Sequence, residues 1–196
     1  MAKKETTLLQ LVLSLCLISI VAAAGLAAVY TITKEPISIS QKQKKVDAIK
    51  SVLPGFKGQT QESKILLPND EDSVTVNLAF NGNQLFGAAV ETYTDKAFKG
   101  SFTLMVGFDS LGNIIGTEVL TANETPGLGD KIDKKKDANF SAQFLKKNPT
   151  EFNMKVKKDG GDVDAITAAT ISSRAFCDAL TRAHSAFLKA KEVSNE

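Results

Sequence analysis

An uncharged apolar segment near the N-terminus is the feature that most constrains how this chain can fold. No residue in 6–33 carries a charge, and the stretch 8–32 is apolar apart from a few scattered polar residues. As an α-helix at ~1.5 Å per residue this stretch is ~37 Å long, which is enough to cross a hydrocarbon core of ~30 Å with some tilt. We therefore expect a single transmembrane helix.

A cleavable signal peptide is the rival interpretation of this segment. Lys3 and Lys4 would form its basic region, and the alanines at 22–24 its cleavage site. The apolar run continues well past these alanines, which favours an uncleaved anchor. Lysines flank the segment on both sides, but a very short N-terminal tail usually stays inside the cell. We therefore expect residues 1–34 to form a cytoplasmic tail and anchor, with the globular domain on the extracytoplasmic side of a bacterial inner membrane.

The charge of the remaining chain argues against nucleic-acid binding. The net charge is +2, and the excess lies wholly in the first 34 residues, where three lysines face only Glu5. The rest of the chain is electrically neutral, has no Trp, and contains Arg174 and Arg182 as its two arginines. Such a composition lacks the basic surface that binds the phosphate backbone of a nucleic acid. We expect no nucleic-acid partner.

The two cysteines and the single histidine do not indicate catalysis or metal binding. Cys16 lies in the apolar segment and Cys177 far downstream, so their spacing matches neither a zinc site nor an iron–sulfur site. Each is expected to be a small buried apolar residue. His184 has no acidic or serine constellation nearby in sequence, and we expect a partly exposed helix histidine.

The residues after the anchor predict a helix followed by an antiparallel sheet. Glu35 and Pro36 end the predicted anchor, and apolar residues at helical spacing predict a juxtamembrane helix or stiff linker over 35–55. From residue 74 onward the apolar period is two, and Asn81 and Gly82 form a typical hairpin turn. Four successive strands joined by short turns imply a meander. The expected strands are 74–80, 84–94, 102–108 and 113–120.

The C-terminal third predicts helices packed on this sheet. A short helix is expected around 141–147, and alternating apolar residues over 152–156 predict one further strand. Residues 172–191 carry apolar side chains at the spacing of an amphipathic helix. The expected fold class is α+β: one N-terminal transmembrane helix, then an antiparallel meander sheet packed with helices. The expected division is 1–34 for tail and anchor, 35–55 for the juxtamembrane segment and 56–196 for the globular domain.

Two segments suggest a binding site, and the first is 123–129, directly after the fourth predicted strand. Pro126 removes a backbone donor, while Gly127 and Gly129 permit positive φ angles or a close backbone approach. Free amides around them could face an anionic or planar ligand. An ordinary turn at a strand exit is the alternative.

The second segment, 164–174, places small and hydroxylated residues at the start of the last predicted helix. Thr170 or Ser172 could be a plain N-cap. The same arrangement suits a phosphate, because a helix start offers backbone donors and the positive end of the dipole. Arg174 could add a charge-assisted hydrogen bond. The alanines at 168 and 169 leave room for a bulky group to approach the Thr170 hydroxyl.

Together these segments make the chain resemble the FMN-binding domain of the G subunit of the Rnf electron-transport complex. The related C subunit of the sodium-translocating NADH:quinone reductase is the alternative, but the chain length of 196 residues favours the Rnf protein. In this family an ApbE-type flavin transferase attaches FMN through its phosphate to the last Thr of an Asp-x-x-(Ser/Thr)-(Gly/Ala)-Ala-Thr motif. The matching positions here are Asp164, Thr167, Ala168, Ala169 and Thr170, and Ala168 stands where Gly is commoner.

The resemblance implies a function in electron transfer. Thr170 would carry covalent FMN, and the flavin would exchange electrons with neighbouring redox subunits of an ion-translocating ferredoxin:NAD oxidoreductase. This makes the chain a redox subunit, not a stand-alone enzyme. Leu128 would offer the flavin ring an apolar contact and Thr125 a hydrogen bond. The full set of expected cofactor-binding residues is Glu124, Thr125, Gly127, Leu128, Gly129, Thr167, Ala168, Ala169, Thr170, Ser172 and Ser173.

Two other functions follow from the same residues. The first is a membrane-tethered FMN-fold domain that serves as a sensor or scaffold without electron transfer. The second is an anchored hydrolase that uses Ser172 or Ser173, for which the sequence supplies no identifiable base.

Overall fold

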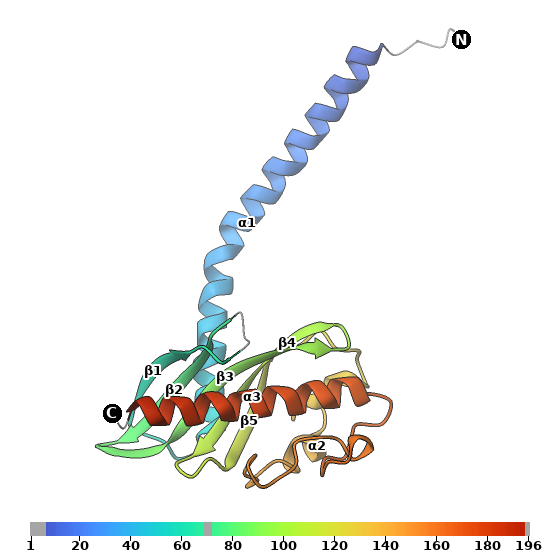
Figure 1. Cartoon of the computed structure of the whole chain (residues 1–196). Helices are drawn as coiled ribbons and strands as arrows, with labels where there is room; N and C mark the ends of the chain where they lie inside the picture. Colours follow the sequence, from blue (N-terminus) through green and yellow to red (C-terminus); the bar gives the residue numbers. More distant parts are fainter. Residues whose placement is uncertain (1–6, 69–71, 195–196) are drawn as a thin grey trace. The chain divides into compact units, whose positions relative to one another are not determined.

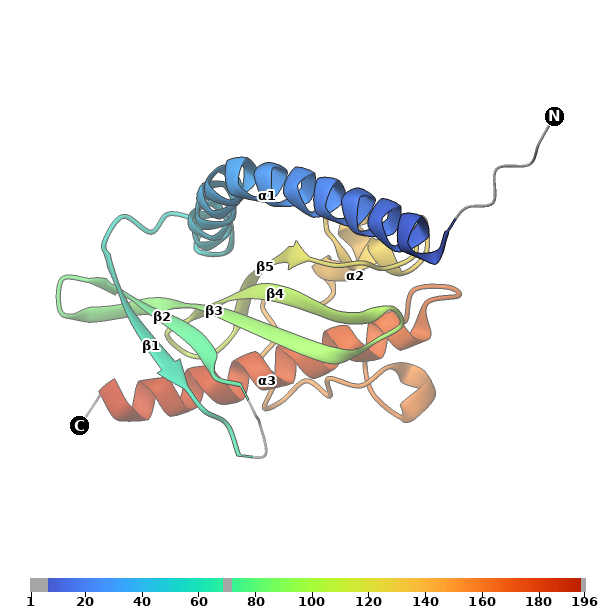
Figure 2. The same cartoon turned by 90° about the horizontal axis from the view of Figure 1, so that it is seen from above.

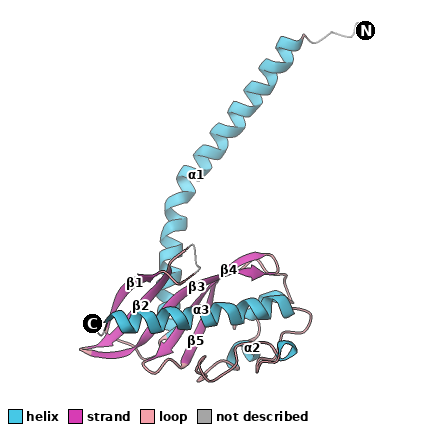
Figure 3. Ribbon diagram, viewed as in Figure 1, coloured by secondary structure: helices cyan, strands magenta, loops and turns pink. Residues whose placement is uncertain are grey.

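The computed structural model describes residues 7–68 and 72–194 of the chain. By internal contacts the chain divides into two compact units, Met1–Lys44 and Lys45–Glu196. The first unit consists of the N-terminal part of the long helix α1 (Leu8–Val52), and the second contains the end of α1 together with all other elements. Figure 3 shows the helices and strands by type.

The N-terminal part of α1 has the length and composition of a membrane-spanning helix. Its most apolar 18-residue stretch is 0% buried. The helix continues through Glu35 and Pro36, although Pro36 cannot donate the i→i−4 hydrogen bond, and the end of the anchor at residue 34 stays a prediction. One expectation about this region is wrong. Cys16 is exposed instead of buried, because it lies in the apolar part of α1, where the neighbouring side chains are exposed as well.

The second unit is built on one five-stranded antiparallel sheet in the order β1-β2-β3-β4-β5 (Figure 1). The four expected strands are confirmed as β2 (Val74–Asn81), β3 (Gln84–Ala97), β4 (Gly100–Asp109) and β5 (Ile114–Thr121). The edge strand β1 (Gln59–Ile65) was not expected, because its sequence is polar and most of its residues are exposed. An edge strand with one solvated face needs few apolar residues.

The helix α3 (Thr170–Ser194) covers one face of the sheet (Figure 2). Its apolar stripe buries Phe176, Leu180 and Phe187, as its amphipathic sequence predicts. The ring of Phe187 stacks on that of Phe108 on β4, with centroids 5.3 Å apart. This confirms the α+β class with helices packed on a meander sheet.

The opposite face of the sheet receives the end of α1. Val52 and Leu53 are buried there in a small cluster with Met105. Two strand glycines permit this approach, because a Cβ at Gly107 would overlap the Val52 carbonyl and one at Gly116 would lie 2.9 Å from the Val52 Cα. The last turns of α1 are therefore in direct backbone contact with β4 and β5.

A nearly buried carboxylate beside this contact joins α1 to the segment that contains Lys134 and Lys135. Glu118 on β5 forms ion pairs with Lys134, at 2.8 Å, and with Lys135. The Ser51 hydroxyl donates to Glu118 at 3.2 Å and accepts from Lys134 at 2.7 Å. Burial would raise the pKa of Glu118, but the hydrogen bonds from the two lysines outweigh it, so the pKa is lowered.

The connection from β5 to α3 contains only short elements: η1 (Gly129–Ile132), α2 (Ala138–Ala142) and η2 (Lys157–Asp159). The helix expected at 141–147 is therefore shorter and begins earlier. The strand expected over 152–156 is wrong, since only Val156 forms an isolated bridge, with Val163. Met154 and Val156 are buried in the main core, which explains the apolar alternation, but the backbone bonds within its own loop.

His184 is buried, which contradicts the expectation of partial exposure. Only 5% of its surface is exposed, and its ring lies 5.7 Å from that of Phe108. Burial lowers the pKa of His184. Cys177 is buried as expected, and burial raises the pKa of its thiol to about 12, so this cysteine is not a thiolate at neutral pH.

Candidate functional site

Three separate segments meet around a cavity of about 320 Å³ at the start of α3. They are the turn between β3 and β4, the loop after β5, and the segment that leads into the first turn of α3. The two segments singled out in the sequence thus lie side by side, although they are about 40 residues apart. The cavity is lined by Phe98, Glu124, Thr125, Leu128, Gly129, Ala168, Ala169, Thr170, Ile171 and Ser172.

Glu124 holds these three segments together. Only 8% of its surface is exposed. Its Oε1 accepts a hydrogen bond from the Phe98 N–H at 3.0 Å, and its Oε2 accepts one from the Ser172 hydroxyl at 2.9 Å. A buried carboxylate with two donors on different elements is costly to disturb, because each donor would lose its partner. Glu124 therefore fixes the shape of the cavity.

The two glycines of the loop after β5 have different roles. Gly127 has a φ of +76° and does not line the cavity, so it serves the turn. Gly129 lines the cavity, and a Cβ there would overlap the Glu124 carboxylate and lie 2.7 Å from the Ser172 oxygen. Glycine at 129 is therefore required for close packing, whereas glycine at 127 is required for backbone conformation.

A tight turn precedes α3 and carries a strained residue. Ala168 has a φ of +61°, in the left-handed region that favours glycine. Ser173 braces this turn: its hydroxyl accepts from the Ile166 N–H at 2.9 Å and donates to the Ala169 carbonyl at 3.0 Å. Ser173 is fully buried and does not line the cavity, so its position indicates a structural role.

The first turn of α3 presents unpaired backbone donors. Ser173 N–H bonds to the Ala169 carbonyl, so Ala169 occupies the N-cap position and neither Thr170 nor Ser172 is the N-cap. In the part of the chain that the structure describes, the N–H groups of Thr170, Ile171 and Ser172 have no acceptor. Thr170 and Ser172 line the cavity, and Thr170 is half-buried. This is the donor arrangement that binds phosphate at helix starts.

Two charged residues near the turn lie outside the cavity. Arg174 does not line the cavity; its Nε and Nη2 bond to Asp159 at 2.7 and 2.8 Å. Asp164, 73% exposed at its side chain, pairs with Lys157 at 2.7 Å. Thr167 also lies outside the cavity, on a neighbouring depression. The cavity itself therefore receives backbone donors rather than a cationic side chain.

The geometry gives no support to a hydrolytic serine. The Ser172 hydroxyl is committed to Glu124 and the Ser173 hydroxyl to the backbone. The only histidine, His184, is 12 residues further along α3 than Ser172, which corresponds to ~18 Å of helix. It is buried against Phe108 and Phe187, so it cannot act as a base for either serine.

Sequence reasoning missed two apolar residues of the cavity. Phe98 is 61% exposed in the turn between β3 and β4, and Ile171 is 46% exposed on the first turn of α3. Leu128, which was expected, is 40% exposed. A large aromatic residue in a polar hairpin turn is unusual and could have served as a signal. These three side chains give the cavity apolar walls suited to a planar ring.

Comparisons with known proteins cover the same part of the chain. The family model described as FMN-binding domain matches residues 98–185, which include all three segments of the cavity. The chain is 34% identical over 188 residues to a protein of Aliivibrio fischeri, covering 91% of this chain and 89% of that one. It is 33% identical over 174 residues to a protein of Shewanella amazonensis, covering 84% and 80%. Both relatives are named as the G subunit of an ion-translocating oxidoreductase complex, and this chain belongs to that family, with an FMN-binding domain in its C-terminal part.

Proposed function

We propose that this chain is the membrane-anchored, FMN-carrying electron-transfer subunit of an ion-translocating oxidoreductase complex of the Rnf type. FMN would be linked through its phosphate to the Thr170 hydroxyl. The observation that carries this proposal is the position of Thr170, which lines the cavity at a helix start with three unpaired N–H groups in the described part of the chain. The family relationship supplies the context.

The residues present fit FMN. The N–H groups of Thr170, Ile171 and Ser172 and the positive end of the α3 dipole stabilise a phosphoryl group. Phe98 and Leu128 offer exposed apolar surface to a ring, and this surface would otherwise face water. Glu124 positions both walls through Phe98 and Ser172. Bound FMN supplies the redox chemistry, and the protein supplies placement and polarity around it.

A covalent link suits the proposed location of the domain. With residues 1–34 as tail and anchor, 35–55 as a juxtamembrane segment and 56–196 as the FMN-binding domain, the cofactor would lie on the extracytoplasmic side. A phosphoester to Thr170 would prevent its loss there. An ApbE-type flavin transferase would be a transient partner, and the exposure of Thr167 and Ala168 gives such an enzyme access to the turn. The lasting partners would be the membrane and redox subunits of the complex.

The test is intact-protein mass spectrometry after expression of the full chain with a flavin transferase. We expect the mass to exceed that of the polypeptide by one FMN less one water, and yellow fluorescence to survive denaturation. Thr170→Ser keeps a hydroxyl and is expected to carry the adduct, whereas Thr170→Ala is expected to lack it. Circular dichroism of each variant checks that it is folded. An adduct on folded Thr170→Ala would place the attachment elsewhere.

A further inference from the structure

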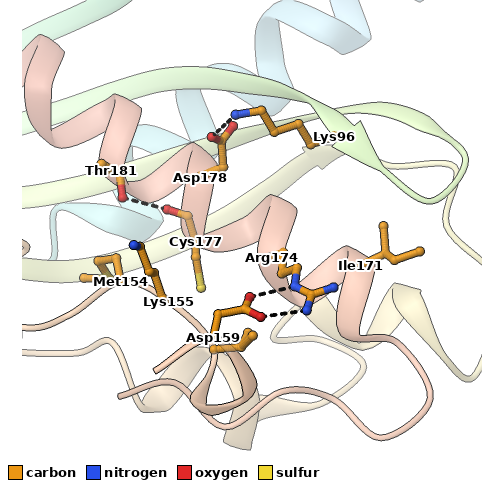
Figure 4. A pocket seen from close by; sticks show the side chains of 10 residues that line it. Lys96, Met154, Lys155, Asp159, Ile171, Arg174, Cys177, Asp178 and Thr181 are labelled. Carbon is orange, nitrogen blue, oxygen red and sulfur yellow. Dashed lines mark hydrogen bonds and ion pairs between the residues drawn. The ribbon is translucent and has the colours of Figure 1, made fainter. Parts of the chain in front are cut away.

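A second and larger cavity, of about 650 Å³, lies along α3 beyond the proposed flavin site (Figure 4). Ile171 is the one residue that lines both cavities, so they adjoin at this side chain. Thr170 does not line the second cavity. Its lining residues are Lys96, Met154, Lys155, Val156, Asp159, Ile171, Arg174, Cys177, Asp178 and Thr181.

The cavity is a groove with an apolar interior. One wall is a continuous face of α3 that runs from Ile171 to Thr181, which corresponds to ~15 Å of helix. The other wall is the loop that contains Met154 and Val156, whose side chains also belong to the main core. Cys177 contributes to the apolar lining and is protonated at neutral pH, because burial raises its pKa to about 12. The interior is therefore mainly apolar and offers no charge to a ligand.

The rim of the groove is charged, with three cations and two carboxylates. Asp178 is already satisfied, because it accepts from Lys96 at 2.5 Å and from the Thr94 hydroxyl at 2.9 Å. Lys155 forms no ion pair within the residues that the structure describes. The rim therefore has a net charge of +1.

Arg174 and Asp159 pair across the groove from opposite walls, as the dashed lines in Figure 4 show. Their side chains are 48% and 37% exposed, and an exposed pair of this kind is held weakly. Asp159 occupies Nε and Nη2, and among the described residues Nη1 has no acceptor, so it is open to a ligand. A guanidinium held in this way is oriented for a further carboxylate or phosphate.

From these features we propose that the groove is a second binding site, for an amphipathic anion. The apolar body of the ligand lies against Met154 and Ile171, and its carboxylate or phosphate bonds to Arg174. Asp159 competes with the ligand for the guanidinium, and Lys155 adds an attractive charge. Because Ile171 also lines the first cavity, occupancy of the groove would be felt at the proposed flavin site. Binding itself does not require the flavin.

The methionines of the chain allow a direct test. Met154 lines the groove, whereas Met105 is buried on the opposite face of the sheet. The full Thr170→Ala chain, labelled with ¹³C at the methionine methyls and placed in lipid nanodiscs, is titrated with 1-naphthoate and with its neutral analogue 1-naphthamide. We expect the Met154 methyl signal to shift saturably with naphthoate and Met105 to stay unchanged. Naphthamide should bind about tenfold more weakly, because it lacks the charge-assisted bond.

Removing either partner of the Arg174–Asp159 pair should change the affinity for naphthoate in opposite directions. A purely structural ion pair would not give this result. Arg174→Gln should weaken naphthoate binding about tenfold, and Asp159→Asn should strengthen it by about threefold, because the competitor of the ligand is removed. Lys45→Gln, which removes the lysine of the Lys45–Glu91 ion pair, is the matched control and should leave binding unchanged. The proposal is overturned if Met154 does not respond, if Arg174→Gln binds as tightly as the parent, or if Asp159→Asn binds more weakly.

Discussion

Replacing Ala168 with glycine should stabilise the domain, which is the reverse of the usual effect of Ala→Gly. Ala168 has a φ of +61°, and a left-handed conformation costs an L-residue ~1–2 kcal/mol that glycine does not incur. Glycine in turn gives the unfolded chain more freedom, which costs ~0.4–1 kcal/mol. The side chain is exposed, so no packing is lost. The net expectation is a gain of ~0.5–1 kcal/mol.

Urea unfolding of the full chain in detergent micelles measures this gain. With a slope of ~2 kcal/mol per M urea, the midpoint of the transition should rise by ~0.3–0.5 M for Ala168→Gly. Lys146 has the same φ of +61° and is also exposed, so Lys146→Gly should shift the midpoint in the same direction. Its N–H bond to the Ile114 carbonyl, at 2.7 Å, is kept by glycine.

Thr167→Gly is the opposing control for this reasoning. Thr167 is exposed and adjacent to Ala168, but its φ is not positive, so glycine there should only add unfolded-state entropy and lower stability by ~0.5–1 kcal/mol. If Ala168→Gly lowers the midpoint as Thr167→Gly does, the strain at Ala168 is not a real feature of the turn. The reasoning would also fail if the two variants were indistinguishable from the parent.

Two further changes test the packing of α1 against the sheet. Gly107→Ala should lower the stability by ~2 kcal/mol or more in urea unfolding, because its Cβ would overlap the Val52 carbonyl, which is backbone and cannot rotate away. Glu118→Gln should cost ~1 kcal/mol at pH 7. The folded-state pKa of Glu118 lies below its ordinary value of 4.5, so its contribution is present above about pH 4.5 and is lost as the pH falls through the folded-state pKa. Unfolding measured across this range should show parent and variant converging in acid.

The meander could be predicted because local signals sufficed for it. β2 to β5 are joined by short turns, their apolar period is two, and each pairs with its neighbour in sequence. The amphipathic spacing of apolar residues likewise predicted α3. The expected strand at 152–156 failed because periodicity reports which side chains are buried, not what the backbone bonds to. Met154 and Val156 lie in a loop but their side chains are buried in the core. Whether such a buried segment is a strand or a loop depends on tertiary contacts.

The composition of the cavity was less accessible from sequence. Phe98 reaches it from a hairpin whose end lies over the start of α3 only once the sheet has formed. Arg174 lies one turn after Thr170 and was a candidate partner for the phosphate. Its guanidinium instead pairs with Asp159, which lies on the opposite wall of the second cavity. Helical spacing defines which face a residue occupies but not which partner competes for its side chain.

The geometry also distinguishes Thr170, the proposed attachment site, from the three other hydroxyls near it. Ser172 and Ser173 already donate to Glu124 and to the Ala169 carbonyl. Thr167 is exposed but lies outside the cavity. Thr170 lines the cavity, its hydroxyl makes no hydrogen bond within residues 7–68 and 72–194, and it stands beside the unpaired N–H groups of the first turn. A phosphoryl group attached there would meet donors already in place, whereas at the other three positions it would have to break a bond or face solvent.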